Sequence, residues 1–176
     1  MDSKRRIPPV LLLVALLVGP ALRPAHACKP CLGDPIERSI GQGSAVLLGK
    51  VAAVAEYPAT PGEKRGAGEA AIEVRVERWL KKPAKGAVKQ GVKFPVRIRW
   101  DGICLGRPAL PKAGDRAIFF IAESTPEGEG QLTGVCSAPI LRVENGKVAV
   151  PSEASEKWGS KPLSLRKFEA RVRAKK

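Results

Sequence analysis

The chain has 176 residues, with 31 lysines and arginines, 17 aspartates and glutamates and one histidine, so its formal net charge at pH 7 is +14. This length suits one domain with its own hydrophobic core. The only histidine, His26, lies in an N-terminal segment that we expect to be removed. Because the rest of the chain has no histidine, it cannot form a Ser-His-Asp triad, a Cys-His pair or a histidine-ligated zinc site. We therefore expect a protein that is not an enzyme and that holds no cofactor or metal of its own.

Residues 1–27 are typical of a secretory signal peptide. Lys4, Arg5 and Arg6 precede an apolar run over 7–22, and small residues around His26 suit cleavage after Ala27. Prolines and a glycine interrupt the apolar run, which is too short to span a bilayer stably. We expect export to the periplasm or the extracellular space, a mature chain that begins at Cys28, and no transmembrane span after cleavage.

The first element of the mature chain is predicted to be a short helix. Asp34 is followed by Pro35, and this pair is typical of a helix start, because aspartate caps free N–H groups and proline suits the first turn. The glycines at 41 and 43 end the helix.

Five later segments are predicted to form β-strands. Some are continuous apolar runs, and others alternate apolar with charged residues, which is typical of strands with one buried face. Gly49 indicates a bulge or bend, and Pro95 indicates an edge position or a bulge. Between the first two strands, residues 58–68 are expected to form an exposed loop. The five predicted strands are 44–54, 72–77, 93–100, 116–122 and 131–136.

Two further elements are predicted near the C-terminus. Apolar residues over 140–143 and 147–150 flank Asn145-Gly146, a pair that favours a tight hairpin turn. Behind these, Leu165, Phe168 and Val172 recur at helical spacing after Ser164, which suits an N-cap. We expect an amphipathic helix that packs on the preceding domain through these apolar positions. A basic helix lying on a membrane surface is the alternative.

The order of these elements predicts a mainly β protein. Five strands with short connections and no alternating helices favour a five-stranded Greek-key barrel of the OB type, with a β-sandwich as the nearest rival. We expect residues 28–138 to form this barrel and residues 139–176 to add the hairpin and the basic helix.

Basic residues are concentrated in two runs, around 81–99 and in the C-terminal segment. Such runs often only keep a surface solvated, but they also favour polyanionic partners, here an anionic envelope surface or an acidic polysaccharide. Export makes nucleic acid the least expected of these partners. The residues expected to contact a polyanion are Lys81, Lys82, Lys85, Arg97, Arg99, Arg166, Lys167, Arg171 and Arg173.

The four cysteines are Cys28, Cys31, Cys104 and Cys136. An even number in an exported chain favours two disulfides, for which the sequence alone allows three connectivities. Haem attachment is excluded because Leu32, and not histidine, follows the CxxC motif. A zinc site or a thioredoxin-like redox pair is less expected, because the other two cysteines are far apart and no strand precedes Cys28 in the mature chain.

Several short motifs follow one another from Cys28 to Cys136 in a characteristic order. They are SAVLLGKV (44–51), IEVRVERWLKKP (72–83), DGIC (101–104), GDRAIFFI (114–121) and LTGVC (132–136). Together with a cysteine directly after the signal cleavage site, this order resembles a netrin-like (NTR) module, specifically the N-terminal domain of tissue inhibitors of metalloproteinases. The resemblance implies an OB fold and the disulfides Cys28–Cys104 and Cys31–Cys136.

The resemblance also implies a mechanism of inhibition. The free α-amino group and the carbonyl of Cys28 would coordinate the catalytic zinc of a metalloprotease, since an α-amino group with a pKa of about 7.7–8.0 is partly neutral at physiological pH. A disulfide would hold this ligand rigidly and reduce the entropy lost on binding. The expected protease-binding ridge consists of Cys28, Lys29, Pro30, Cys31, Gly102 and Ile103.

Several features depart from the family pattern: the spacing is CxxC instead of CxC, Lys29 stands where an apolar side chain is usual, and a third disulfide is missing. The cysteine-rich second domain of the inhibitors is also missing, and the segment after Cys136 has no counterpart in the family. One alternative is therefore a non-inhibitory NTR module that binds anionic surfaces or polymers. A second alternative is a lipid anchor on Cys28, although Ala25 stands where lipoprotein signals usually carry leucine.

Overall fold

The computed structural model describes residues 33–175 except 59–61, 63–65, 85–86, 102–106, 125–128 and 134–137. The chain divides into two compact units, Met1–Pro30 and Cys31–Lys176, and all described residues belong to the second. The predicted signal peptide, all four cysteines and every residue of the predicted protease-binding ridge lie outside the described residues.

The predicted short helix forms as α2, Pro35–Gln42. The Asp34 carboxylate accepts hydrogen bonds from the backbone N–H groups of Ile36 and Glu37, both at 2.8 Å. These bonds satisfy two of the free donors at the helix start. The N-cap and the first-turn proline are therefore confirmed.

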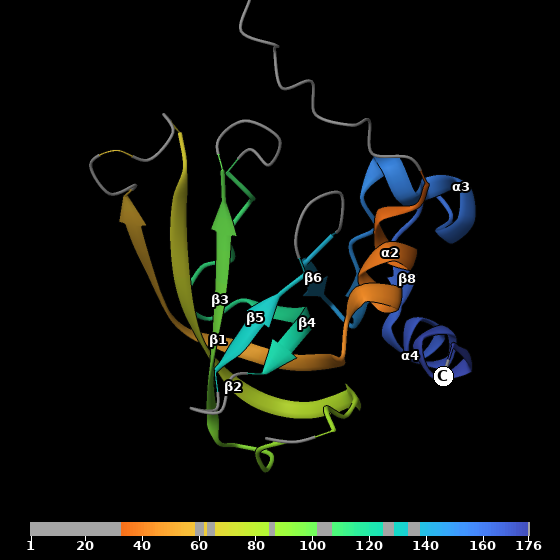
Figure 1. Cartoon of the computed structure of the whole chain (residues 1–176). Coiled ribbons are helices and arrows are strands. Elements are labelled where there is room, and N and C mark those ends of the chain that lie inside the picture. The colour runs from red at the N-terminus through yellow and green to blue at the C-terminus, as the bar shows by residue number, and fades with distance from the viewer. Residues whose placement is uncertain are drawn as a thin grey trace, which may run out of the picture. The chain divides into compact units, whose positions relative to one another are not determined.

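The described residues form a mainly β fold, as predicted, with an eight-stranded sheet (Figure 1). Its first five strands are β1 (Ala45–Pro58), β2 (Gly68–Lys81), β3 (Lys93–Trp100), β4 (Arg116–Ser124) and β5 (Gly130–Leu132). The antiparallel pairs are β1–β2, β2–β3, β4–β5 and β1–β4, and the pair β3–β5 is parallel. These five pairings close into a ring with the order β1-β2-β3-β5-β4.

The first two strands are longer than predicted. Residues 55–58 pair with residues 68–71, which lengthens the β1–β2 ribbon up to the two end residues of the segment expected to be a loop. This part of the sequence is rich in alanine and lacks the apolar alternation that marks a strand, so only its pairing partner reveals it. The last strand of the ring is shorter than predicted, since β5 ends at Leu132.

Gly49 lies at a β-bulge, as predicted. The register between β1 and β2 shifts between Leu48 and Gly49, where Leu48 lies opposite Arg78 and Gly49 lies opposite Val76. Glu77 is thus the extra residue on β2. Before it, the even-numbered residues of β2 point into the ring of strands, and after it an odd-numbered residue, Trp79, does so. As a result, the adjacent residues Glu77 and Arg78 can both reach partners on the outer face of the sheet.

Two hydrophobic clusters lie on opposite faces of β1 and β4. Leu47 and Phe119 belong to the cluster that also contains the inward side chains of β2 and β3, including Phe94. Leu48 and Phe120 belong to the second cluster, which is formed with the helices. Burial on both faces explains why these two strands are continuous apolar runs, whereas β2 and β3 alternate.

The C-terminal segment covers the outer face of β1 and β4. It consists of β6 (Ile140–Glu144), β7 (Lys147–Val148), a 3₁₀ turn at Ser152–Ala154, α3 (Ser155–Trp158), β8 (Leu163–Ser164) and α4 (Leu165–Ala174). The predicted turn between β6 and β7 is confirmed, because Asn145 and Gly146 have φ values of 50° and 72°.

The predicted terminal helix α4 is confirmed, with Ser164 accepting a hydrogen bond from the Lys167 backbone N–H. Its apolar positions are buried: Leu165 is 8%, Phe168 0% and Val172 1% exposed. In this structure these side chains pack into the protein's own core, which contradicts the alternative of a membrane-surface helix. None of the helices in the described ranges is long and apolar enough to span a membrane.

Candidate functional site

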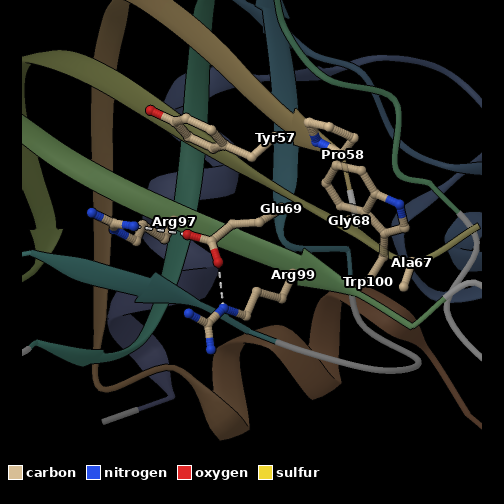
Figure 2. A pocket seen from close by; sticks show the side chains of 8 residues that line it. All are labelled: Tyr57, Pro58, Ala67, Gly68, Glu69, Arg97, Arg99 and Trp100. Atoms are coloured by element: carbon tan, nitrogen blue, oxygen red, sulfur yellow. Dashed lines mark hydrogen bonds and ion pairs between the residues drawn. The ribbon is translucent and has the colours of Figure 1, made fainter. Parts of the chain in front are cut away.

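A pocket of about 410 Å³ lies at the end of the sheet where β1 ends, β2 begins and β3 ends (Figure 2). Its lining residues are Tyr57, Pro58, Ala67, Gly68, Glu69, Arg97, Arg99 and Trp100. Tyr57 is 51% exposed, and it is one of two large hydrophobic side chains that are exposed in the described part of the chain. Trp100 is the last of the lining residues in the sequence, and it precedes Gly102 of the predicted protease-binding ridge by two positions.

Gly68 allows the Trp100 ring to lie against the backbone of β2. A Cβ atom at position 68 would be 2.6 Å from the tryptophan ring, which is closer than side chains approach one another. Trp100 therefore fills the end of the barrel and forms one wall of the pocket, while Tyr57 projects from β1 at the same end.

Glu69 holds the two arginines of the pocket. Its carboxylate accepts hydrogen bonds from Arg97 at 2.8 Å and from Arg99 at 2.5 Å, and Arg97 also donates to Glu129 at 2.6 Å. Burial alone would raise the pKa of Glu69, but the hydrogen bonds and charges of the two arginines outweigh burial and lower it. Hydrogen bonds to Glu129 and Glu69 raise the pKa of Arg97.

This network favours binding over catalysis. Glu69 is ionised and already bonded to two guanidinium groups, so it is a poor general acid or base. Arg97 is committed to two carboxylates, whereas the Arg99 side chain is 72% exposed and pairs with Glu69 through its Nε atom. The two arginines also line a second hollow of about 300 Å³ with Glu129, Gly130 and Gln131.

The basic residues predicted to bind a polyanion lie in separate places. Lys81 ends β2 and donates to the Gly43 carbonyl at 2.7 Å, with the exposed Lys82 next to it. Arg97 and Arg99 lie opposite Ala71 and Glu69, near the other end of β2. Lys85 lies outside the described residues.

On α4, the basic side chains predicted to contact a polyanion are exposed, but not all are equally available. Arg171 lies over the Trp158 ring, 5.0 Å from its centroid, and donates to the Lys157 carbonyl. Arg166, Lys167 and Arg173 are exposed on the same helix.

A different set of basic residues is brought together by strand register. Lys93 lies opposite Arg75, Arg75 lies opposite Lys50, and Lys50 lies opposite Arg116. We call these four residues, which cross β3, β2, β1 and β4 on the outer face, the cationic row. The sequence analysis did not find it, because its members are 18 to 66 positions apart and each is an ordinary polar position in its strand. Only the register of the sheet could have revealed it.

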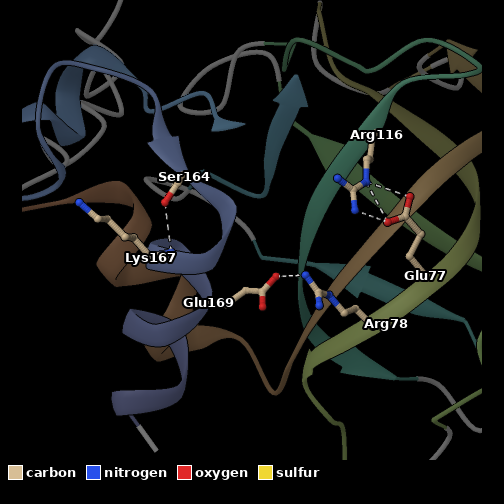
Figure 3. A network of polar contacts seen from close by, with 6 residues as sticks. All are labelled: Glu77, Arg78, Arg116, Ser164, Lys167 and Glu169. Atoms are coloured by element: carbon tan, nitrogen blue, oxygen red, sulfur yellow. Dashed lines mark hydrogen bonds and ion pairs between the residues drawn. The ribbon is translucent and has the colours of Figure 1, made fainter. Parts of the chain in front are cut away.

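Two ion pairs link β2 to β4 and to α4 (Figure 3). Arg116 donates to the Glu77 carboxylate at 2.6 to 2.9 Å, and this bonding raises the pKa of Arg116. Glu169, which is buried, extends from α4 to pair with Arg78. The bulge at Glu77 makes both contacts possible from adjacent residues.

Within the described ranges, no three or more histidine, cysteine, aspartate or glutamate side chains are grouped so that they could hold a metal ion. Comparison of the chain with protein-family models and with curated proteins finds no match.

Proposed function

We propose that this protein is an exported, non-enzymatic NTR-type module whose ring of strands is an OB-type barrel. The order β1-β2-β3-β5-β4 supports this assignment, because a five-stranded Greek-key barrel closes in this way, with the last strand inserted between the third and the fourth. The short helix before β1 and the long, strongly bent first strand are compatible with the same module.

We further propose that the module inhibits a zinc metalloprotease through a free N-terminal Cys28. The observation that carries this proposal is the pocket at the tips of β1, β2 and β3. Tyrosine, tryptophan and arginine are the residue types that contribute most to protein–protein binding, and Tyr57, Trp100 and Arg99 meet at this pocket. In the sequence, Trp100 is followed after Asp101 by Gly102 and Ile103, two residues of the proposed ridge.

In this proposal the Cys28 amino group binds the protease zinc, and disulfides from Cys28 and Cys31 hold the N-terminus in place. Lys29 would then enter the specificity pocket of the protease. A basic residue there favours a protease whose pocket offers a carboxylate, because a buried lysine ammonium needs an opposite charge.

The first test is a titration of the exported protein against a panel of zinc metalloproteases, with intact mass to establish that the chain begins at an unmodified Cys28. Acetylation of the N-terminal amine removes its lone pair from coordination, so we expect acetylated protein to lose inhibition. Inhibition that survives acetylation, or an acylated N-terminus in the exported protein, would contradict the proposed chelation.

The second test addresses the pocket. Tyr57→Ala is expected to weaken inhibition by about fivefold or more, the loss typical of an interface residue that contributes over 1 kcal/mol. Val92→Ala is the matched control, because Val92 is the other exposed large hydrophobic residue and precedes the opposite end of β3. If both variants inhibit as well as the wild type, the pocket is not part of the inhibitory surface.

A further inference from the structure

The cationic row is a line of four basic side chains at directly opposed positions of four adjacent strands. Lys50, Arg75 and Lys93 are exposed, and Arg116 is partly buried. Neighbouring strands lie about 4.8 Å apart, so the four positions span about 14 Å across the sheet. The row thus presents positive charge along a line that crosses the strands.

Within the described residues, carboxylates compensate the two ends of this row and not its middle. Lys93 pairs with Glu73 at 2.6 Å, and Arg116 pairs with Glu77 at 2.6 Å. Lys50 and Arg75, in the middle, have no ion pair or side-chain hydrogen bond within the part of the chain that the structure describes. Asp115, next to Arg116 in the sequence, accepts a hydrogen bond from the Lys112 backbone instead.

Like charges at directly opposite positions destabilise a sheet, because their side chains lie about 4.5–5.5 Å apart at Cβ. Lys50 lies opposite Arg75, which no carboxylate compensates, and on its other side lies opposite Arg116, whose charge Glu77 offsets. A row of anionic groups laid along the four side chains would replace repulsion with attraction. Such a ligand must be extended and must carry closely spaced negative charges.

We propose that the cationic row binds a linear acidic polysaccharide through its carboxylate or sulfate groups. Among the described residues Tyr57 is the one exposed aromatic side chain, and it lies at the far end of the β1–β2 ribbon, opposite Glu69. No exposed ring in that part of the chain therefore gives the row the stacking surface that single-stranded nucleic acids use. The choice of a polysaccharide also depends on the proposed export. The row shares no residue with the proposed protease-binding ridge, and its tests do not depend on inhibition.

The experiment compares retention of the purified protein on polygalacturonate, dextran sulfate and neutral dextran at increasing salt concentration. We expect salt-sensitive binding to one or both acidic polymers and none to neutral dextran. The double variant Lys50→Gln/Arg75→Gln is expected to bind roughly tenfold more weakly, since two exposed charge contacts are removed. Lys50→Arg/Arg75→Lys, which keeps both charges, is expected to bind within about threefold of the wild type on the same grounds.

The matched control is Lys161→Gln/Arg107→Gln, which removes one lysine and one arginine from exposed positions outside the row and outside the predicted polyanion-binding residues. It has the same net charge as the test variant, so an equal loss of binding in both would show a general charge effect and overturn the assigned site. Unchanged binding of Lys50→Gln/Arg75→Gln would also overturn it.

Two further probes test the class of ligand. A single-stranded oligonucleotide and vesicles of phosphatidylglycerol in phosphatidylcholine are presented to the same variants. Binding that depends on the row for either of these probes, but not for the acidic polysaccharides, would contradict the polysaccharide assignment.

Discussion

Glu69 shows how one residue can decide the character of a site. Its carboxylate bonds to Arg97 and Arg99, and Arg97 in turn bonds to Glu129. The two arginines that look like free positive charges in the sequence are therefore partly neutralised. By contrast, Lys50 and Arg75 are unremarkable in the sequence and have no such partner in the described part of the chain.

The lowered pKa of Glu69 makes the stability of the protein depend on pH. Because the folded state binds the proton less readily than the unfolded state, the stabilising contribution is complete above the ordinary glutamate pKa of about 4.3. It is lost as the pH falls below that value and through the lower folded-state pKa. We expect Glu69→Gln to lose less stability than the wild type between pH 5 and pH 3 (about the window of that titration).

Urea unfolding at a series of pH values measures this difference directly. Glu144→Gln is a suitable control, because Glu144 is an exposed residue of the β6–β7 hairpin. An identical pH dependence of the free energy of unfolding in the wild type and in Glu69→Gln would contradict the role assigned to Glu69.

At the scale of elements, the bulge between β1 and β2 controls what the second strand presents to either side. Before Glu77, inward residues such as Val74 fill the barrel, and after it Leu80 joins the cluster beneath the helices. Gly49 lies at this bulge because the backbones approach closely there. A Cβ atom at position 49 would be 2.4 Å from the Val74 side chain and 2.7 Å from the Arg75 carbonyl oxygen.

Gly49→Ala is therefore expected to destabilise the protein by about 1–3 kcal/mol through overpacking. Gly41→Ala is the matched control, since Gly41 lies in α2 and a Cβ atom there would meet nothing within 4 Å. In a helix, alanine is favoured over glycine by about 0.5–1 kcal/mol, so this control is expected to be as stable as the wild type or more stable. Urea denaturation of both variants measures the difference, and equal stabilities would show that the bulge tolerates a side chain.

At the scale of the whole second unit, the C-terminal segment is part of the folded core. The Phe168 ring lies 6.4 Å from Phe120 of β4 and 5.3 Å from Trp158 of α3, measured between ring centroids. The ion pair between Arg78 and Glu169 lies at the edge of the same contact, and Lys175 pairs with Glu37 of α2. The outer apolar face of β1 and β4 is therefore covered by residues from both ends of this unit.

Phe168→Ala should destabilise the protein by about 3–5 kcal/mol, because it removes a fully buried aromatic ring. Arg166→Ala, on the exposed side of the same helix, is expected to change stability by no more than about 0.5 kcal/mol. Thermal and urea unfolding measure both changes. A small effect of Phe168→Ala would mean that α4 is dispensable for the stability of the barrel.

Several local features could be predicted from the sequence because neighbouring residues determine them. The Asp34-Pro35 start of α2, the Asn145-Gly146 turn and the Ser164 cap of α4 each depend on short-range hydrogen bonds or on backbone conformational preference. The alternating strands were also predicted, because a buried and an exposed face impose a period of two.

The ends of strands with weak patterns could not be predicted in this way. The alanine-rich end of β1 becomes a strand only because residues 68–71 pair with it. Likewise, a run of basic residues does not show which of them share a surface. Lys81 and Arg99 belong to one run but lie near opposite ends of β2.

The sequence by itself determined the mainly β class, the two end helices and the C-terminal hairpin, since these depend on local propensity and on periodicity. Only the tertiary structure decided that the strands close into a ring, that α4 is buried on β1 and β4, and that Lys93, Arg75, Lys50 and Arg116 form a row. The physical reason is that strand register joins residues far apart in the chain, and register is set by the packing of the whole sheet.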